Sequence, residues 1–435
     1  MEELLARAKK VAEEAEVFLA SSEQTHVQFE TNRLKHIQSK QSRHVALRIV
    51  RQGRIGYVSA TELGDNRQEM VDMAVESAEF GMVARFQLPA LTSYPAIDIF
   101  DPAVESVSIA QMTGLGEEMV SAVTGHTADI MCEAWVTRAV VSLNLINSRG
   151  GQADYRKSLF SLDIEGSLIR STDMLFVGES ESSCRPVLRT EEVSAAVLWQ
   201  LDMAKNQASV ASGSLPVVFT PMGVASALMP SLMVAFNGKT VLQGASPVGS
   251  RLGQLIFDEK LSLWDDATVP YRPGSRPCDD EGVPCQRTGL IEEGRVAHFF
   301  YDLQTAALAD TSSTGNGNRN QGGLPVTAPN AFVIASGDTS FAEMVGDMKE
   351  GLIVEQLMGA SQGNVLGGDF SGNVLLGYKV ENGKVVGRVK NTMVAGNIYQ
   401  VLKQMAAVGS DSKWVGGMIS TPSLYCLGVS MASNG

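Results

Sequence analysis

Apolar residues recur at helical spacing in the first twenty residues, among them Leu4, Ala8, Val11 and Ala15. Side chains three or four positions apart fall on one face of a helix, so residues 1–20 are predicted to form an amphipathic surface helix. Charged residues run through the same stretch, which leaves no apolar core of the kind that a signal peptide needs.

Patterns typical of strands follow. Four short segments are candidate strands: Val27–Glu30, Leu34–Gln38, Val45–Val50 and Arg54–Ser59. The last two flank Arg51-Gln-Gly53, a glycine-bearing connection that favours a hairpin. Further β-pattern extends over Met131–Phe176 and turns at Ser148–Gly151. Between and after these strands, helical spacing predicts helices over Asn66–Phe80, Ile109–Thr124 and Val193–Ala211.

The length of 435 residues is about three times the ~150 expected of one domain, so at least two domains are predicted. The boundary falls at Ala211–Ser214, which gives an N-terminal α/β region over 1–205 and a second domain over 212–435. Two lobes within the first region, 1–87 and 105–205, would be joined by a crossover containing three prolines.

The second domain has hairpin signals and glycine-rich connections. Glu381-Asn-Gly-Lys384 is the clearest, because Asn-Gly suits a type I′ turn, and Glu292–Arg295 is another. This pattern predicts a curved antiparallel sheet or barrel-like domain with inserted helices, and an α+β architecture overall.

Asn206–Gly238 carries no charge, and the apolar part 215–236 is long enough to span a bilayer. Three prolines interrupt it, however, and Thr220-Pro221 has the form of a helix N-cap followed by proline at the first helical position. A buried strand over 215–219 followed by a helix is therefore predicted, with no membrane partner.

Charge and cysteine content narrow the possible partners. Lys and Arg number 35 against 48 Asp and Glu, a net charge of −13, which argues against binding a phosphate backbone, so no nucleic-acid partner is expected. The five cysteines are scattered and odd in number, as expected of reduced thiols in the cytoplasm.

No local motif identifies a catalytic centre. None of the five histidines has a zinc-binding spacing, and Cys278 and Cys285 lack further soft ligands nearby. The glycine-rich run Gly363–Asp369 has no following lysine, as a phosphate loop would. Two alternatives for a metal-free hydrolase remain: His298 with Asp302, and the hydroxyls of Thr311–Thr314.

A series of short segments in the second domain resembles the TldD/PmbA family of peptidases in sequence and in order. The segments are Asp280–Pro284, Gly289–Gly294, Ser313–Asn316 with Arg319, Gly351–Val354, Gly368–Ser371, Gly377-Tyr378, Glu381–Lys384, Ala395–Asn397, Val408–Asp411 and Pro422-Ser423. Residues 46–60 are similar to the N-terminal hairpin of the same family, so the resemblance covers nearly the whole chain.

The resemblance implies a cytoplasmic complex that degrades small or unfolded peptides. One type of subunit, TldD-like, carries zinc on a His-Glu-x-x-x-His helix with a later cysteine; the other, PmbA-like or TldE-like, lacks these ligands. In this chain the corresponding helix follows strand 217–219, and Met203–Phe257 contains no Asp, Glu, His or Cys. Residues 408–423 contain no cysteine either. The resemblance therefore implies the PmbA/TldE-like subunit, with zinc expected only in a partner and no catalytic residue here.

A non-catalytic subunit of this kind can hold a peptide as an added β-strand. The candidate peptide-binding residues are Ser313, Thr314, Gly315, Asn316, Arg319, Gly368, Asp369, Phe370 and Ser371, with Arg319 available to a peptide carboxylate. The other interpretation of these glycines is that they serve sharp turns only.

The expected partner is a TldD-like zinc subunit or a second copy of this chain. The uncharged helix with Met222, Met229, Met233 and Phe236 is a candidate dimer interface. Two alternative functions stay open: a peptidase with a relocated or metal-free site, and a non-enzymatic peptide- or protein-binding protein, as in the family's old description as a modulator of DNA gyrase.

Overall fold

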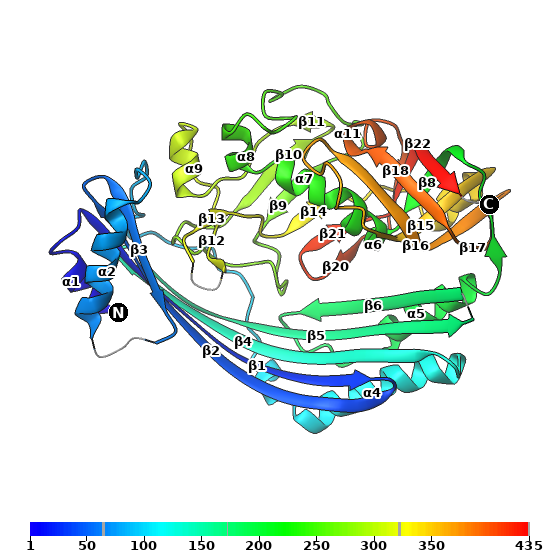
Figure 1. Ribbon diagram of the computed structural model, residues 1–435, viewed down its shortest axis with the longest axis horizontal. Coiled ribbons are helices and arrows are strands. Elements are labelled where there is room, and N and C mark those ends of the chain that lie inside the picture. Colours follow the sequence, from blue (N-terminus) through cyan, green and yellow to red (C-terminus); the bar gives the residue numbers. More distant parts are fainter. Residues whose placement is uncertain (63–65, 172, 321–322, 434–435) are drawn as a thin grey trace.

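The N-terminal half is built on one long antiparallel sheet with the strand order β3-β2-β1-β4-β5-β6. The computed structural model describes residues 1–62, 66–171, 173–320 and 323–433. The strands of this sheet are β1 (Glu14–Glu30), β2 (Arg33–Arg51), β3 (Arg54–Ala60), β4 (Met131–Asn147), β5 (Gln152–Arg170) and β6 (Asp173–Ser183). They curve beneath the C-terminal half of the molecule (Figure 1).

Helices cover the sheet at its two ends. α1 (Glu2–Ala8) and α2 (Arg67–Glu79) pack on β1, β2 and β3 at one end. The short α3 (Ala103–Ser106), α4 (Ile109–His126) and α5 (Glu191–Met203) pack on β4, β5 and β6. α2 starts as expected after Asn66, whose side chain accepts a hydrogen bond from the Glu69 N–H.

The helix predicted over residues 1–20 is wrong beyond Ala8, because β1 begins at Glu14. Ala15 and Val17 are buried on one face of β1 and Phe18 on the other, in separate apolar clusters. A strand buried on both faces reads as a continuous apolar run, and in this segment such a run imitated helical spacing.

The hairpins that carried turn signals are confirmed. Gln52 and Gly53 have φ of 50° and 70°, and Asn382 and Gly383 have φ of 49° and 73°. Positive φ at both central residues is what a type I′ turn requires, and it explains the glycine in each pair. The helix expected over 193–211 ends earlier, at Met203.

β1 pairs with β4 along most of its length, so the two lobes considered for the N-terminal region form one sheet. The segment that joins them, predicted to be irregular over residues 88–102, has no helix or strand there and only an isolated bridge between Ala90 and Gly150. The division into 1–205 and 212–435 stays a prediction.

The C-terminal half contains a closed barrel. Its five strands pair in the ring β15-β8-β22-β18-β16 and back to β15: β8 (Gly213–Phe219), β15 (Glu350–Met358), β16 (Asp369–Glu381), β18 (Thr392–Asn397) and β22 (Leu424–Ser433). β17 (Lys384–Val389), β7 (Gln207–Ala208) and β19 (Met405–Val408) extend the same sheet. The predicted α+β fold with a barrel-like second domain is confirmed.

A second six-stranded sheet lies beside the barrel. It consists of β9 (Leu263–Asp266), β10 (Arg287–Glu292), β11 (Arg295–Val296), β14 (Phe332–Ile334), β20 (Lys413–Val415) and β21 (Ile419–Thr421). β12 (Gly317–Asn318) pairs with β13 (Val326–Thr327). The inserted helices are α6 (Pro221–Gly223), α7 (Met229–Ala235), α8 (Gly238–Leu242), α9 (Leu303–Leu308), α10 (Phe341–Asp347) and α11 (Ile398–Val401).

The uncharged stretch after residue 206 forms β8, α6, a π-helical turn η1 (Val224–Leu228) and α7. The Thr220 side chain accepts a hydrogen bond from the Gly223 N–H, so the predicted N-cap is confirmed. The π-turn ends at Leu228, two residues before Pro230, whose ring would clash with the carbonyl of Ser226 in a regular α-helix. None of the described helices is long and apolar enough to cross a membrane.

Met229 and Phe236 are fully buried in the apolar core of the barrel region. The prediction that this helix supplies a dimer interface is therefore wrong for these residues, because the chain's own core covers them.

Candidate functional site

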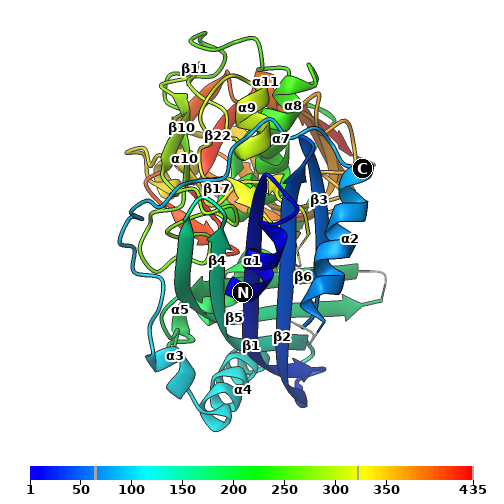
Figure 2. The ribbon, with the colours of Figure 1, turned by 90° about the vertical axis from the view of Figure 1, so that its left-hand side faces the viewer.

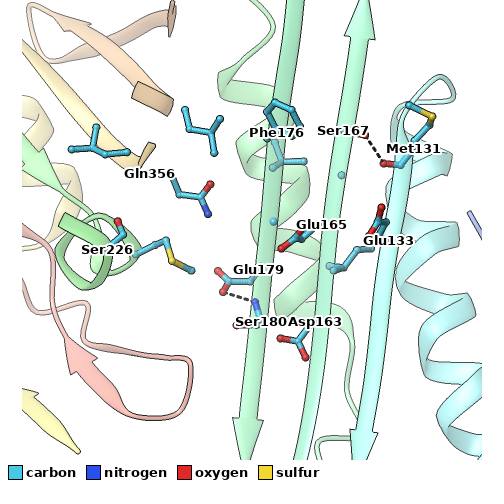
Figure 3. A pocket seen from close by; sticks show the side chains of 17 residues that line it. Met131, Glu133, Asp163, Glu165, Ser167, Phe176, Glu179, Ser180, Ser226 and Gln356 are labelled. Atoms are coloured by element: carbon cyan, nitrogen blue, oxygen red, sulfur yellow. Dashed lines mark hydrogen bonds between the residues drawn. The ribbon is translucent and has the colours of Figure 1, made fainter. Parts of the chain in front are cut away.

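A cavity of about 540 Å³ lies between the edge of the N-terminal sheet and the barrel. One wall comes from β4, β5 and β6, and the other from α6, η1, β15 and β16. The sheet wall is strongly acidic, whereas the barrel wall is mostly apolar (Figure 3). The lining includes Glu133, Asp163, Glu165, Glu179, Met222, Ser226, Gln356 and Leu357.

Strand alternation places the acidic side chains on this wall. Glu133 on β4 lies directly opposite Glu165 on β5, and Asp163 is two residues along β5 on the same face. Their neighbours Ala134 and Ile164 point to the other face, into the apolar cluster that includes residues of α4 and α5. The polar half of an amphipathic sheet therefore becomes the cavity wall.

The acidic groups differ in their surroundings. Burial, and to a lesser degree the neighbouring Glu165 carboxylate, raises the pKa of Asp163, although a hydrogen bond from Ser161 opposes the shift. Glu179 on β6 is ion-paired with Lys413 of β20, and one of its carboxylate oxygens accepts from the Ser180 N–H at 2.8 Å. The cavity therefore keeps uncompensated negative charge mainly on the β4–β5 side.

Glu355 is a buried carboxyl group next in sequence to the cavity residue Gln356. Burial raises its pKa to about 7, and the hydrogen bond from the Thr220 hydroxyl, at 3.3 Å, only partly opposes this. Thr220 is the N-cap of α6, so this titrating group is joined to the start of the helix that lines the cavity.

Met222 and Ser226 are the residues that this helix presents to the cavity. The Ser226 hydroxyl donates to the Gly223 carbonyl at 3.3 Å. A thioether and a hydroxyl do not form a zinc site without imidazole, thiolate or carboxylate ligands. The residues present therefore do not fit a zinc ion at this helix. Within the described part of the chain, no three His, Cys, Asp or Glu side chains gather as a metal-binding group.

The outer edge of β6 beside the cavity is capped rather than open. The Gln200 side chain of α5 accepts from the Gly178 N–H at 2.9 Å and donates to the Gly178 carbonyl at 3.1 Å. Arg388 likewise donates to the Met174 carbonyl at 2.9 Å. A peptide cannot form main-chain hydrogen bonds at Gly178 while Gln200 occupies both of its groups.

The predicted loop Ser313–Asn316 lies apart from the cavity and is bonded internally. Both hydroxyls, of Ser313 and Thr314, donate to the Tyr301 carbonyl, at 3.1 and 3.2 Å. Asn316 is fully buried and donates to Asp265 and to the Ala328 carbonyl. Gly315 has a φ of 77°, and a Cβ there would lie 2.8 Å from the Pro284 carbonyl. A side chain would be strained at this position, which supports the interpretation that Gly315 serves a sharp turn.

Arg319 is not available to a peptide carboxylate, contrary to the sequence-based expectation. Its side chain is fully buried, ion-paired with Glu16 of β1, and lies over the Phe18 ring at 5.1 Å. Its Nε also donates to the Asp280 carbonyl at 3.0 Å. The guanidinium group is therefore buried between the two halves of the chain, and its hydrogen bonds are made to residues of the protein.

The second predicted segment, Gly368–Ser371, opens β16 and does not line the cavity, although Leu375 of the same strand does. Phe370 is buried in the barrel core, and Gly368, with a φ of 83°, fits closely against the Tyr399 ring. Asp369 accepts from the Asn397 side chain at 2.8 Å. Asp369 and Ser371 are exposed, so of this segment they alone could contact a ligand.

The structure does not assemble the alternative catalytic groups. His298 is exposed, whereas the buried Asp302 carboxylate accepts from Thr305 and Thr327 as the cap of α9. Cys278 and Cys285 are free and buried, and burial raises the pKa of Cys278 to about 12. His298 and Asp302 do not have the geometry of a nucleophile beside a base, and in the other alternative the Ser313 and Thr314 hydroxyls donate to the Tyr301 carbonyl.

Sequence reasoning missed the cavity because its acidic residues come from different strands. Asp163 and Glu165, two positions apart in a β-pattern, were the available signal for a polar sheet face. That face and the residues Met222 and Gln356 line one cavity only because the barrel packs on the sheet. No local sequence pattern encodes this packing.

Comparison with known proteins places these features in context. Residues 212–433 match the model of the PmbA/TldA metallopeptidase C-terminal domain, and residues 15–78 match domain 1 of the same metallopeptidases. An uncharacterized protein of Methanocaldococcus jannaschii is 26% identical over 97% of each chain. A metalloprotease of the same archaeon is 21% identical over 94% of this chain and 92% of its own length. The crystal structure of TldE from Thermococcus kodakarensis has the same fold, with a TM-score of 0.91, 21% identity and full coverage of both chains.

Proposed function

This chain belongs to the PmbA/TldD family of metallopeptidases, and we propose that it serves there as a peptide-binding subunit without its own zinc. In this role it contributes to cytoplasmic proteolysis of small or unfolded peptides, and hydrolysis takes place in a zinc-bearing relative. The observation that carries the proposal is the helix that faces the cavity with Met222 and Ser226.

The donor chemistry of the helix supports a subunit without zinc. A catalytic zinc takes about three protein ligands of the imidazole, thiolate or carboxylate type. Residues 203–257 supply none of these, and Cys426 is buried in β22, where its thiol faces the barrel core. Burial raises the pKa of this thiol, which opposes the thiolate form that binds metal.

The cavity supports peptide binding through side chains rather than through strand addition. Met222, Phe176 and Leu357 offer apolar contacts, and Glu133 with Glu165 offers a negative field. Such a mixture suits a short peptide with an ammonium group, either at its N-terminus or on a lysine side chain. Gln200 covers the strand edge, so the peptide is held at the cavity wall.

The partner and the compartment are part of the proposal. All five cysteines are free and buried, as in proteins of a reducing cytoplasm. We propose a dimer with a TldD-like zinc subunit, or with a second copy of this chain, and no nucleic-acid partner because of the charge of −13.

The proposal is tested by titrating the purified full-length chain with a fluorescein-labelled unstructured peptide that contains lysine. Fluorescence anisotropy reports binding, and metal analysis reports zinc in the same preparation. We expect saturable binding, weakened by Glu165→Gln, in a protein with no stoichiometric zinc. The control Glu79→Gln removes an equal charge from the exposed end of α2 and should leave binding unchanged. Stoichiometric zinc, or a peptide affinity that Glu165→Gln does not alter, would contradict the proposal.

A further inference from the structure

Among the residues that the structure describes, no strand lies beside the first part of β2 on its outer side. β3 pairs with Val45–Arg51 only, whereas β1 pairs with β2 over its whole length. Residues 33–44 therefore form a free strand edge along the rim of the sheet, next to the point where β3 stops (Figure 2).

The turn between β2 and β3 shows which main-chain groups this edge presents. Arg51 and Arg54 close a two-residue type I′ hairpin, so the N–H and C=O groups of Arg51 point toward β3. Val50 points the other way, since its carbonyl accepts from the Glu13 N–H at 2.9 Å. The β1–β2 register is regular between His36 and Val50, and alternation carries this parity along the strand.

The same parity makes Arg43, Gln41, Ser39 and Ile37 present their N–H and C=O groups outward. No residue in the described ranges forms a hydrogen bond with these eight groups. Such a row of main-chain donors and acceptors is a template for one more strand.

A groove adjoins the place that this strand would occupy. It has a volume of about 830 Å³ and begins where β3 ends at Ala60, which pairs with Val45. Its lining residues are Lys40, Gln41, Ser42, Arg43 and His44 of β2, Ser21, Ser22 and Glu23 of β1, and Thr61 and Glu62 just beyond β3. Because β1 residues also line it, the groove extends over the face of the sheet, and a strand that continued the line of β3 would run along its β2 rim and face the free groups of β2.

The edge is basic within an acidic chain. Residues 33–44 contain Arg33, Lys35, Lys40 and Arg43 and no Asp or Glu, against a net charge of −13 for the whole chain. Only Lys35 has an ion-pair partner among the described residues, Glu30 at 3.4 Å. Arg33, Lys40 and Arg43 are exposed and form no ion pair with a described residue, although Glu23 and Glu62 line the same groove as Lys40 and Arg43.

These charges decide between possible occupants. If two copies of this chain paired edge to edge, cations would face cations, and like charges directly opposite each other destabilise a strand pair. An acidic strand would instead place carboxylates beside Lys40 and Arg43. The edge also lies across the sheet from β6 and the cavity, so its occupant is distinct from a peptide bound there.

We propose that an extended, Asp- and Glu-rich segment of another protein binds at the free edge of β2 as an added strand. The main-chain groups of Ile37, Ser39, Gln41 and Arg43 give it affinity that is largely independent of sequence. Lys40 and Arg43 select it by charge. The site does not depend on the proposed peptide-binding role of the cavity.

The test uses the full-length chain and a labelled peptide of alternating Glu and Thr residues, about ten residues long to match a typical strand. A peptide of alternating Gln and Thr is the uncharged control, because a lysine peptide is also expected at the acidic cavity. By fluorescence anisotropy at low salt, the acidic peptide should bind saturably and at least about tenfold more tightly than the uncharged peptide. Cations on edge strands can also serve to prevent pairing. If they do so here, the acidic peptide will not bind, and the proposal fails.

Two pairs of variants separate charge from main-chain recognition. The double variant Lys40→Glu, Arg43→Glu should lower the affinity for the acidic peptide by at least about tenfold. Lys9→Glu with Lys10→Glu makes the same change of net charge at two exposed residues near α1 and should leave affinity within about twofold. Equal losses in the two double variants would show attraction by net charge alone and would overturn the proposal.

Ser39→Pro removes one outward N–H, whereas Ser39→Ala keeps it, and both lose the contact of the Ser39 hydroxyl with Thr25. We expect weaker binding by the proline variant only, with thermal unfolding showing that both variants are folded. Equal affinity of the two variants would contradict strand addition. Sedimentation of the wild type provides a further test, because self-association that Ser39→Pro abolishes and Ser39→Ala keeps would make a second copy the occupant.

Discussion

Arg319 forms a buried ion pair with Glu16, a residue 303 positions earlier on the first strand of the N-terminal sheet. Arg48 of β2 joins the same cluster, since it donates to Glu16 at 3.1 Å and to Glu281 at 2.6 Å. Two arginines and two glutamates thus connect the sheet with the loops of the second half, away from solvent. Glu281 and Arg319 of this cluster both belong to segments whose sequences resemble the peptidase family.

Replacing Arg319 should strongly destabilise the fold. Arg319→Met removes the cation and leaves Glu16 with only Arg48 as its charged partner in the interior. Breaking a buried pair in this way costs about 3–5 kcal/mol. Urea unfolding should show this loss, whereas Arg33→Met, at an exposed arginine, should stay within about 0.5 kcal/mol of the wild type. Equal stability of the two variants would show that the buried pair is replaceable.

The buried Glu355 carboxyl should make stability depend on pH near neutrality. Its pKa is raised from 4.5 to about 7 by burial, so the folded state holds this proton more tightly than the unfolded state. The contribution of Glu355 to the free energy of unfolding is therefore most favourable below pH 4.5, where the carboxyl is protonated in both states. It is lost as the pH rises through 7. Glu355→Gln should gain stability over the wild type across that interval, by about 3 kcal/mol in all.

The measurement is urea unfolding of both proteins at a series of pH values. Glu350→Gln, at an exposed residue of the same strand, is the control and should show no such trend. A difference between Glu355→Gln and the wild type that stays constant from pH 4.5 to 8 would mean that Glu355 titrates normally.

The side-chain amide of Gln200 should stabilise the fold, because it satisfies the main-chain groups at the outer edge of β6. Gln200→Leu keeps a similar volume but leaves the N–H and C=O of Gly178 without their partners. Unpaired buried polar groups cost about 1–3 kcal/mol, and Gly178 is only partly buried at the cavity, so thermal or urea unfolding should show a loss of about 1 kcal/mol. Gln362→Leu, at an exposed loop position, is the control. A fully stable Gln200→Leu variant would indicate that water satisfies Gly178 and that this edge is open to a peptide.

Local signals in the sequence predicted much of the fold. Asn382-Gly383, Gln52-Gly53 and the Thr220-Pro221 cap are encoded within a few residues, and the structure has each of them. Features set by tertiary packing were not predictable in this way. β1 was misread because both of its faces are buried near Val17, and Arg319 was taken for a ligand-binding residue because its partner, Glu16, is remote in sequence.

For the cavity, too, the sequence predicted the features that are local and not those that depend on tertiary packing. The absence of zinc ligands from residues 203–257 could be read directly from the sequence. The acidic wall could not, because Glu133 and Glu165 become neighbours only through the register of β4 and β5, and face Met222 only after the barrel packs on the sheet.

Mass spectrometry of a peptide mixture incubated with the full-length chain tests the central claim, peptide binding without catalysis, most directly. The mixture should include lysine-containing unstructured peptides, with equimolar zinc added and a chelator in a parallel sample. We predict that the peptides co-elute with the protein and keep their intact masses in both samples. Cleavage that requires zinc and stops with the chelator, in a preparation free of other peptidases, would contradict the account.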